Sequence, residues 1–115
     1  MDIYEQGESI DREILLADGT TPFDSNDFLT ISVQVKRKYS LDDAGTYSIA
    51  NGKLSRESET GVVFFDIPPS VSATLPVGIY LYEVTTTETD SDFDGGIRTR
   101  VYQGDCFKLI AKISS

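Results

Sequence analysis

Hydrophobic and polar residues alternate along much of this chain, with the period of two that is typical of β-strands. In the clearest stretch, residues 29–36, each apolar residue is followed by a polar one. Such a strand buries one face and exposes the other to water. We therefore expect a strand here whose buried face carries four side chains: Leu29, Ile31, Val33 and Val35.

Further apolar stretches and turns extend this pattern to the rest of the chain. Asn51-Gly52 is a preferred hairpin centre, and Pro68-Pro69 ends a mostly apolar run. Residues 70–76 are too few for a long helix, so we expect a crossing loop or one turn. The remaining expected strands are residues 10–16, 61–67, 79–87, 97–102 and 107–113. Seven to eight short strands predict an all-β protein, an antiparallel β-sandwich of immunoglobulin-like type.

Composition fits one domain over residues 1–115 and excludes several chemistries. The chain is 39% hydrophobic and 25% charged, which is ordinary for a globular protein. It has no histidine, and therefore no imidazole base, Ser-His pair or His-ligated metal. Its single cysteine cannot form an internal disulfide or a multi-cysteine zinc site. We predict a protein that is not an enzyme and needs no cofactor.

Charge bears on partners and location. Nineteen acidic and ten basic residues give a formal net charge of −9. Nucleic acids and anionic membranes attract clustered lysine and arginine, so neither is an expected partner. Residues 1–7 have neither a basic region nor an apolar run, and we expect no signal peptide. The chain should therefore be made in a cytoplasm, where Cys106 stays reduced.

One acidic loop resembles the first half of a calcium-binding loop. Asp90, Asp92 and Asp94 alternate before Gly95, as carboxylates do where they supply several oxygens to Ca²⁺. The closing ligand is missing, because the twelfth position is Val101. We expect an exposed hairpin tip with no tightly bound metal. Weak calcium binding is the alternative.

A second motif is structural. Gly78 and Tyr80 introduce a strand after a crossover, the position at which a tyrosine corner occurs in β-sandwiches. We expect the Tyr80 ring to be buried. Its hydroxyl should bond to the backbone of the crossover at residues 70–76.

The order of these elements resembles the small β-sandwich domains of tailed-phage virions, such as the N-terminal domain of baseplate upper proteins. Those domains begin with a Gly-acid strand and an Asp-Gly turn before a long alternating strand. They continue through a Gly-led apolar strand, a Gly-x-Tyr-x-Tyr-Glu-Val strand, a hairpin and a closing strand. The matching pieces here are residues 6–8, 18–20, 29–35, 61–67, 78–84 and 104–113.

The resemblance implies a non-enzymatic structural subunit of a phage particle, in the baseplate or tail, the neck or the capsid. It implies docking to other virion proteins, a homo-oligomer or symmetric assembly, synthesis in the host cytoplasm and a final location in the virion. It supplies no catalytic residues. The alternative is a stand-alone binding module for carbohydrate or another ligand, assisted by calcium at the Asp90 loop.

Overall fold

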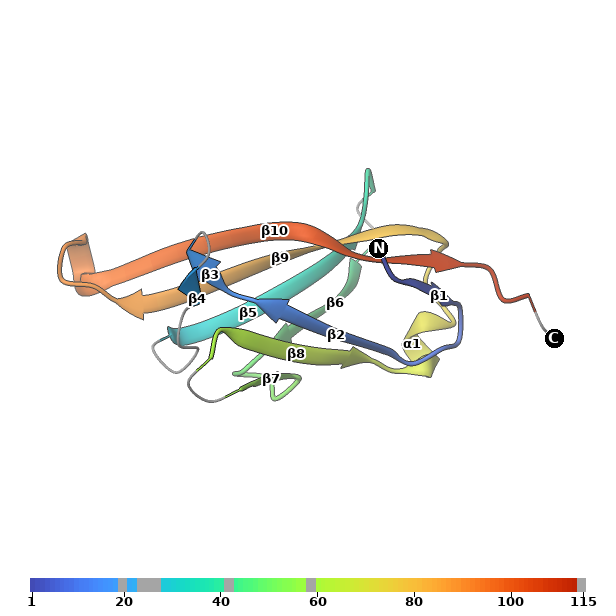
Figure 1. Ribbon diagram of the computed structural model, residues 1–115, viewed down its shortest axis with the longest axis horizontal. Coiled ribbons are helices and arrows are strands. Elements are labelled where there is room, and N and C mark those ends of the chain that lie inside the picture. Colours follow the sequence, from blue (N-terminus) through green and yellow to red (C-terminus); the bar gives the residue numbers. More distant parts are fainter. Residues whose placement is uncertain (19–20, 23–27, 41–42, 58–59, 114–115) are drawn as a thin grey trace.

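Two main β-sheets make up most of the protein (Figure 1). The computed structural model describes residues 1–18, 21–22, 28–40, 43–57 and 60–113. The larger sheet contains, in spatial order, β1 (Ile3–Glu5), β10 (Ile97–Ile110), β9 (Gly78–Thr89), β5 (Phe28–Arg37) and β6 (Asp43–Ser48). The smaller sheet contains β2 (Ile10–Leu15), β8 (Val62–Ile67) and β7 (Leu54–Arg56), and a separate pair joins β3 (Ala17–Asp18) to β4 (Thr21–Pro22).

The prediction of an all-β, largely antiparallel protein is confirmed. The strand pairs are antiparallel except for β1 with β10, which are parallel. The crossover after β8 forms one short helix, α1 (Pro69–Ser72), and the β9–β10 turn contains the short 3-10 helix η2 (Asp94–Gly96).

The number of strands was underestimated. The described residues form ten strands rather than seven or eight. Three of them, β1, β3 and β4, have only two or three residues, too few for a period to be recognised. The segments 97–102 and 107–113, expected as two strands, instead belong largely to one, β10, with a register shift between Asp105 and Phe107.

The register of β5 is correct at three of its four expected core positions. Ile31, Val33 and Val35 are at most 1% exposed. The prediction for Leu29 is wrong, because this side chain is 57% exposed and Phe28 is buried instead. A register shift between residues 28 and 30 is the cause: a bulge inserts one residue and reverses the faces on either side of it.

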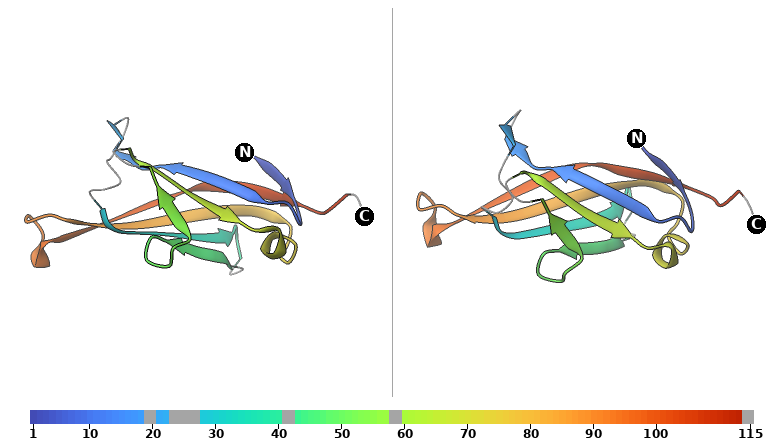
Figure 2. Two further views of the ribbon diagram at one scale, coloured as in Figure 1. Left: turned by 90° about the horizontal axis from the view of Figure 1, so that it is seen from below. Right: turned by 60° about the horizontal axis from the view of Figure 1, so that its bottom comes forward.

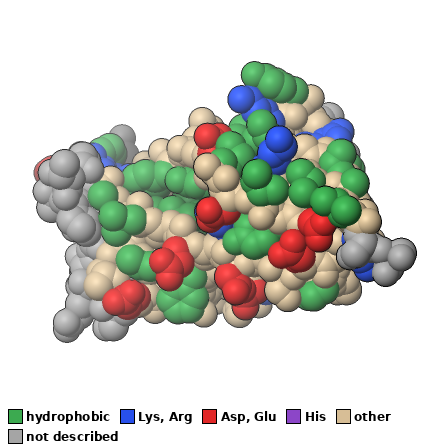
Figure 3. Space-filling model, turned by 45° about the vertical axis from the view of Figure 1, so that its right-hand side comes forward, with side chains coloured by type: hydrophobic (Ala, Val, Ile, Leu, Met, Phe, Trp, Pro, Cys, Tyr) green, Lys and Arg blue, Asp and Glu red, His purple; other side chains and the backbone are tan. Residues whose placement is uncertain are grey.

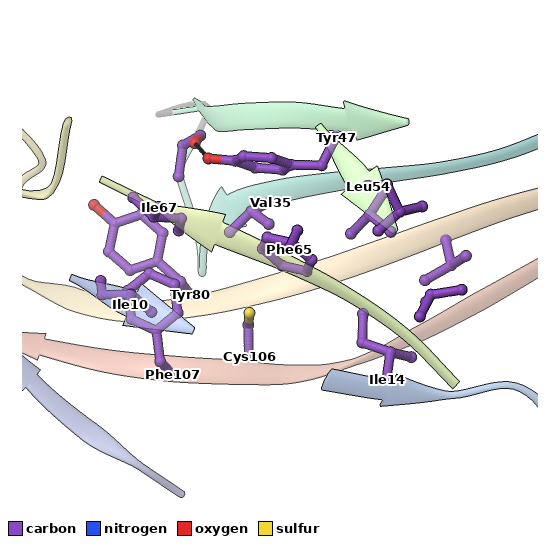
Figure 4. Packing of buried hydrophobic residues seen from close by; sticks show 14 of the residues in the cluster. Ile10, Ile14, Val35, Tyr47, Leu54, Phe65, Ile67, Tyr80, Cys106 and Phe107 are labelled. Carbon is purple, nitrogen blue, oxygen red and sulfur yellow. Dashed lines mark hydrogen bonds between the residues drawn. The ribbon is translucent and has the colours of Figure 1, made fainter. Parts of the chain in front are cut away.

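The core lies between the two sheets, and both contribute side chains to one cluster (Figures 2 and 4). Two ring pairs stack within it: Tyr47 with Phe65 at a centroid distance of 4.6 Å, and Tyr80 with Phe107 at 4.8 Å. Cys106 is buried among them, and burial raises the pKa of its thiol to about 12. The cysteine is therefore a small core side chain in its thiol form, not an activated nucleophile.

The predicted tyrosine corner is present. The Tyr80 ring is fully buried, and its hydroxyl donates a hydrogen bond of 2.7 Å to the carbonyl oxygen of Pro76. Gly78 has a φ of +146°, which a side chain rarely adopts, and a Cβ there would lie 3.1 Å from Cδ of Arg37. The Tyr80 hydrogen bond thus fixes the crossover to the start of β9, and Gly78 leaves room there for the Arg37 side chain.

Replacing Tyr80 by phenylalanine should lower the free energy of unfolding by about 1 kcal/mol, because the Pro76 carbonyl loses a hydrogen bond near the core. Urea unfolding measures the change. Tyr39→Phe is the control, since Tyr39 is 97% exposed, and it should have almost no effect. Equal stability of Tyr80→Phe and the wild type would contradict this role of the hydroxyl.

Candidate docking surface

The β9–β10 hairpin extends beyond the rest of the protein. Its strands have 12 and 14 residues, whereas the strands of the smaller sheet have six or fewer. Figure 1 shows the hairpin passing the ends of β2 and β8, and the molecule measures 55 × 28 × 27 Å. The distal part of the hairpin is therefore presented to the surroundings instead of being enclosed by the two sheets.

The turn at the end of the hairpin is held by its own polar groups. Oδ1 of Asp90 accepts a hydrogen bond of 3.0 Å from the backbone N–H of Asp92. Oδ2 of the same side chain lies 3.6 Å from Nη1 of Arg98. The backbone N–H of Asp90 donates to the carbonyl oxygen of Gly96 at 2.9 Å. These contacts hold the turn together from within the hairpin.

The three candidate calcium ligands are placed as follows. Asp90 is engaged inside the turn, and Asp92 is exposed. Asp94 begins η2, and its side chain lies outside the described part of the structure. Within the described residues, no three acidic or cysteine side chains come together as a metal site would require.

We expect calcium to bind this loop no more tightly than about 1 mM, the weak end of the range for calcium sites. The reason is that Asp90 already bonds to a backbone N–H and faces Arg98. Calorimetric titration with calcium chloride is the measurement. Micromolar binding that disappears in Asp92→Asn would contradict the expectation and favour the calcium-assisted binding module.

Apolar side chains are exposed along the distal hairpin. Phe93 at the turn is 46% exposed, Ile97 42% and Val101 57%. The guanidinium carbon of Arg98 lies 5.4 Å from the centroid of the Phe93 ring, a cation–π contact that holds the ring in place. Apolar residues at a preorganised tip are suited to insertion into a partner, because little side-chain freedom is lost on binding.

The free edge of β10 is the second notable feature of the hairpin. β9 pairs with β10 along nearly its whole length, whereas β1 pairs only with Lys108–Ile110. Residues 97–105 therefore have no strand on their other side among the described residues. Edge strands usually carry charged side chains, especially lysine, or a proline or bulge that prevents pairing. Residues 97–105 contain no lysine or proline, and their two arginines form ion pairs with Asp90 and Glu88 within the hairpin.

The outer face of β5, β9 and β10 is polar and slightly hollowed. A shallow depression of about 430 Å³ lies there. Nε2 of Gln103 donates a hydrogen bond of 2.8 Å to Oε2 of Glu83 within it. Its lining residues are Gln34, Lys36, Lys38, Leu81, Tyr82, Glu83, Gln103, Gly104 and Asp105. The mixture of positive, negative and amide groups suits polar side chains of a partner.

A different surface carries paired acids. Asp11 and Asp66 lie directly opposite one another on β2 and β8. A hydrogen bond between their carboxyl groups raises the pKa of Asp66, with further contributions from burial and from the charge of Asp11. On the face of the molecule drawn in Figure 3, acidic side chains lie mainly across the lower half, and lysine and arginine side chains lie mainly near the upper edge.

This pair predicts how stability depends on pH. Because the pKa of Asp66 is raised in the folded state, ionisation of this carboxyl is less favourable in the folded protein than in the unfolded chain. The free energy of unfolding should therefore fall as the pH rises and the carboxyl ionises. Asp66→Asn should therefore stabilise the protein at pH 7 by less than about 0.5 kcal/mol, and less still near pH 3. Denaturant unfolding at both pH values measures this. Asp105→Asn, which removes the same charge opposite Leu81, is the control. An equal effect of both substitutions would contradict a specific Asp11–Asp66 repulsion.

Comparison of the chain with protein-family models, with curated proteins and with solved structures finds no match. Helices long and apolar enough to cross a membrane are absent from the described residues. The resemblance to phage domains therefore rests on the sequence elements alone.

Sequence reasoning identified the loop at the hairpin tip but missed the open edge of β10. The lack of proline and lysine in residues 97–105 is the signal that points to it.

Proposed function

We propose that the chain is an immunoglobulin-like β-sandwich. Its strand order supports this: β2, β8 and β7 take the places of strands B, E and D of that fold, and β10, β9, β5 and β6 those of G, F, C and C′. Tyr80 then lies near the start of strand F, where such domains carry their tyrosine corner. The β9–β10 hairpin corresponds to strands F and G.

We further propose that it is a non-enzymatic structural subunit of a phage particle, which docks to other virion proteins through the end of the β9–β10 hairpin. The extended hairpin, with Phe93 exposed at an ordered turn, is the observation that carries the proposal. The resemblance in the order of sequence elements supplies the class of partner. Aromatic side chains that enter a partner's pocket commonly dominate the energy of a protein interface.

Co-expression with the products of the genes beside this one tests the proposal, with complex formation followed by size-exclusion chromatography and light scattering. We expect one of these products to elute with the chain. Phe93→Ser should weaken that complex about tenfold or more, as the loss of a buried aromatic anchor does.

Val77→Ser is the matched control, because Val77 is 47% exposed, close to the 46% of Phe93, and precedes β9 at the end of that strand away from the turn. It should leave the complex intact. Equal weakening by both variants would contradict docking through the tip. Calcium-dependent glycan binding in the absence of any protein complex would favour the stand-alone binding module.

A further inference from the structure

We infer that a second copy of this chain pairs with the open edge of β10, antiparallel and about a two-fold axis at Val101. The inference deepens the proposed function, because it specifies how the docking subunit forms a symmetric unit. It rests on residues 97–105 of β10, which pair with β9 on one side and have no strand on the other side among the described residues.

Two backbone hydrogen bonds show which groups face the open edge. The N–H of Asp90 donates to the carbonyl oxygen of Gly96, and the N–H of Lys38 donates to the carbonyl oxygen of Ile79. Along an antiparallel strand, the backbone N–H and C=O groups of successive residues point alternately to one neighbouring strand and the other. The backbone groups of even-numbered residues of β9 therefore point to β10, and those of their even-numbered partners on β10 point back to β9. The N–H and C=O groups that face outward therefore belong to Ile97, Thr99, Val101, Gln103 and Asp105.

The register follows from the limits of this edge. The turn ends at residue 96, and the strand shifts register after Asp105. Val101 is the midpoint of the segment between them. A two-fold axis there pairs all nine residues of one copy with all nine of the other, and the outward-facing groups make about ten hydrogen bonds across the junction.

The side chains suit this register better than its neighbours. Val101, which is 57% exposed, meets its own copy, Thr99 meets Gln103, and Arg100 meets Tyr102. An axis at residue 99 or 100 would place arginine directly opposite arginine, which is unfavourable in a sheet.

The charges of the two arginines are compensated within each copy. Nε of Arg100 lies 2.7 Å from Oε1 of Glu88, and Arg98 faces Asp90. The remaining charge of the edge, Asp105, meets Ile97 in this register. No two like charges therefore lie opposite one another across the junction, and this self-complementarity favours a second copy as the occupant.

Sedimentation velocity of the full chain from about 5 to 500 µM tests the pairing. We expect a monomer–dimer equilibrium, weakened about tenfold or more by Val101→Lys, because the axis brings the two lysines together. Leu15→Lys is the matched control: Leu15 is also 57% exposed but lies on β2, and its substitution should leave the dimer unchanged. A wild-type chain that stays monomeric at 500 µM overturns the inference, as does a dimer equally sensitive to both substitutions.

Disulfide trapping tests the register. In Val101→Cys the two new thiols face each other at a Cα separation of about 5.5 Å, within the range of disulfides. In Thr99→Cys they are offset by four residues, or about 13 Å. Oxidation with copper phenanthroline should crosslink the first variant and not the second, and the buried Cys106 should contribute little. Failure of Val101→Cys to crosslink, or equal crosslinking of both variants, overturns the register.

The same samples separate this inference from the proposed function. Phe93→Ser should leave the dimer intact, because Phe93 lies in the turn and outside the edge. A monomer that still binds a neighbouring gene product through Phe93 overturns the pairing alone. A dimer that binds none of those products overturns the proposed docking function alone.

Discussion

Replacing Val33 by aspartate should lower the free energy of unfolding by about 4 kcal/mol or more. A measurable fraction of the molecules should then be unfolded at 25 °C. Val33 is 0% exposed and lies between Val84 and Tyr47 on the neighbouring strands. An ionised carboxylate at this position has no counter-charge among its neighbours across the strands. Burying it costs free energy, because the carboxylate must either take up a proton or be exposed to water by unfolding of the core. A total stability of about 5–15 kcal/mol makes such a loss severe. Urea unfolding followed by circular dichroism measures it.

Thr30→Asp on the same strand is the control. Thr30 is exposed, and its hydroxyl shares a hydrogen bond of 2.5 Å with that of Thr87, so its loss should change stability by at most about 1 kcal/mol. Similar unfolding midpoints for the two variants would show that the register of β5 is wrong.

Truncating Phe107 to alanine should lower stability by about 3–5 kcal/mol, the usual result of removing a buried ring. Phe107 is 0% exposed, stacks on Tyr80 and meets the edge of the Tyr4 ring at 6.0 Å. These contacts join β1, β9 and β10, so the cavity should loosen all three strands. Thermal and urea unfolding both report the change.

Phe64→Ala provides the comparison for that result. Phe64 is on β8 beside the buried Phe65, but its own ring is 42% exposed. Its removal should lower stability by about 1 kcal/mol or less, because a half-exposed ring loses less apolar burial and leaves no closed cavity. A larger effect at Phe64 than at Phe107 would contradict the placement of the core between the two sheets.

The sequence predicted local structure where a strand alternates regularly or carries a known motif. Alternation in β5 placed Ile31, Val33 and Val35 correctly, and the Gly78–Tyr80 motif predicted the hydrogen bond to Pro76. Leu29 was misplaced because a bulge arises from pairing with β9, and pairing is not written in the local pattern of one strand. Strands as short as β3 have no period to detect.

The candidate surface was only partly predictable. The acidic loop was recognised as a hairpin tip from its glycines and aspartates, but the role of Asp90 within the turn depends on Arg98 across the hairpin. The open edge of β10 depends on which strand ends the sheet, and this is a property of the tertiary arrangement. Phe93 and Val101 have no special local pattern, so their exposure emerged only with the fold.

The proposed virion role is tested most directly by mass spectrometry of phage particles purified from cultures that carry this gene. We expect the chain to remain with the particles through a density gradient, at a fixed and even copy number relative to the major capsid protein. Its absence from intact particles, with the chain found only in the soluble lysate, would contradict the proposed function.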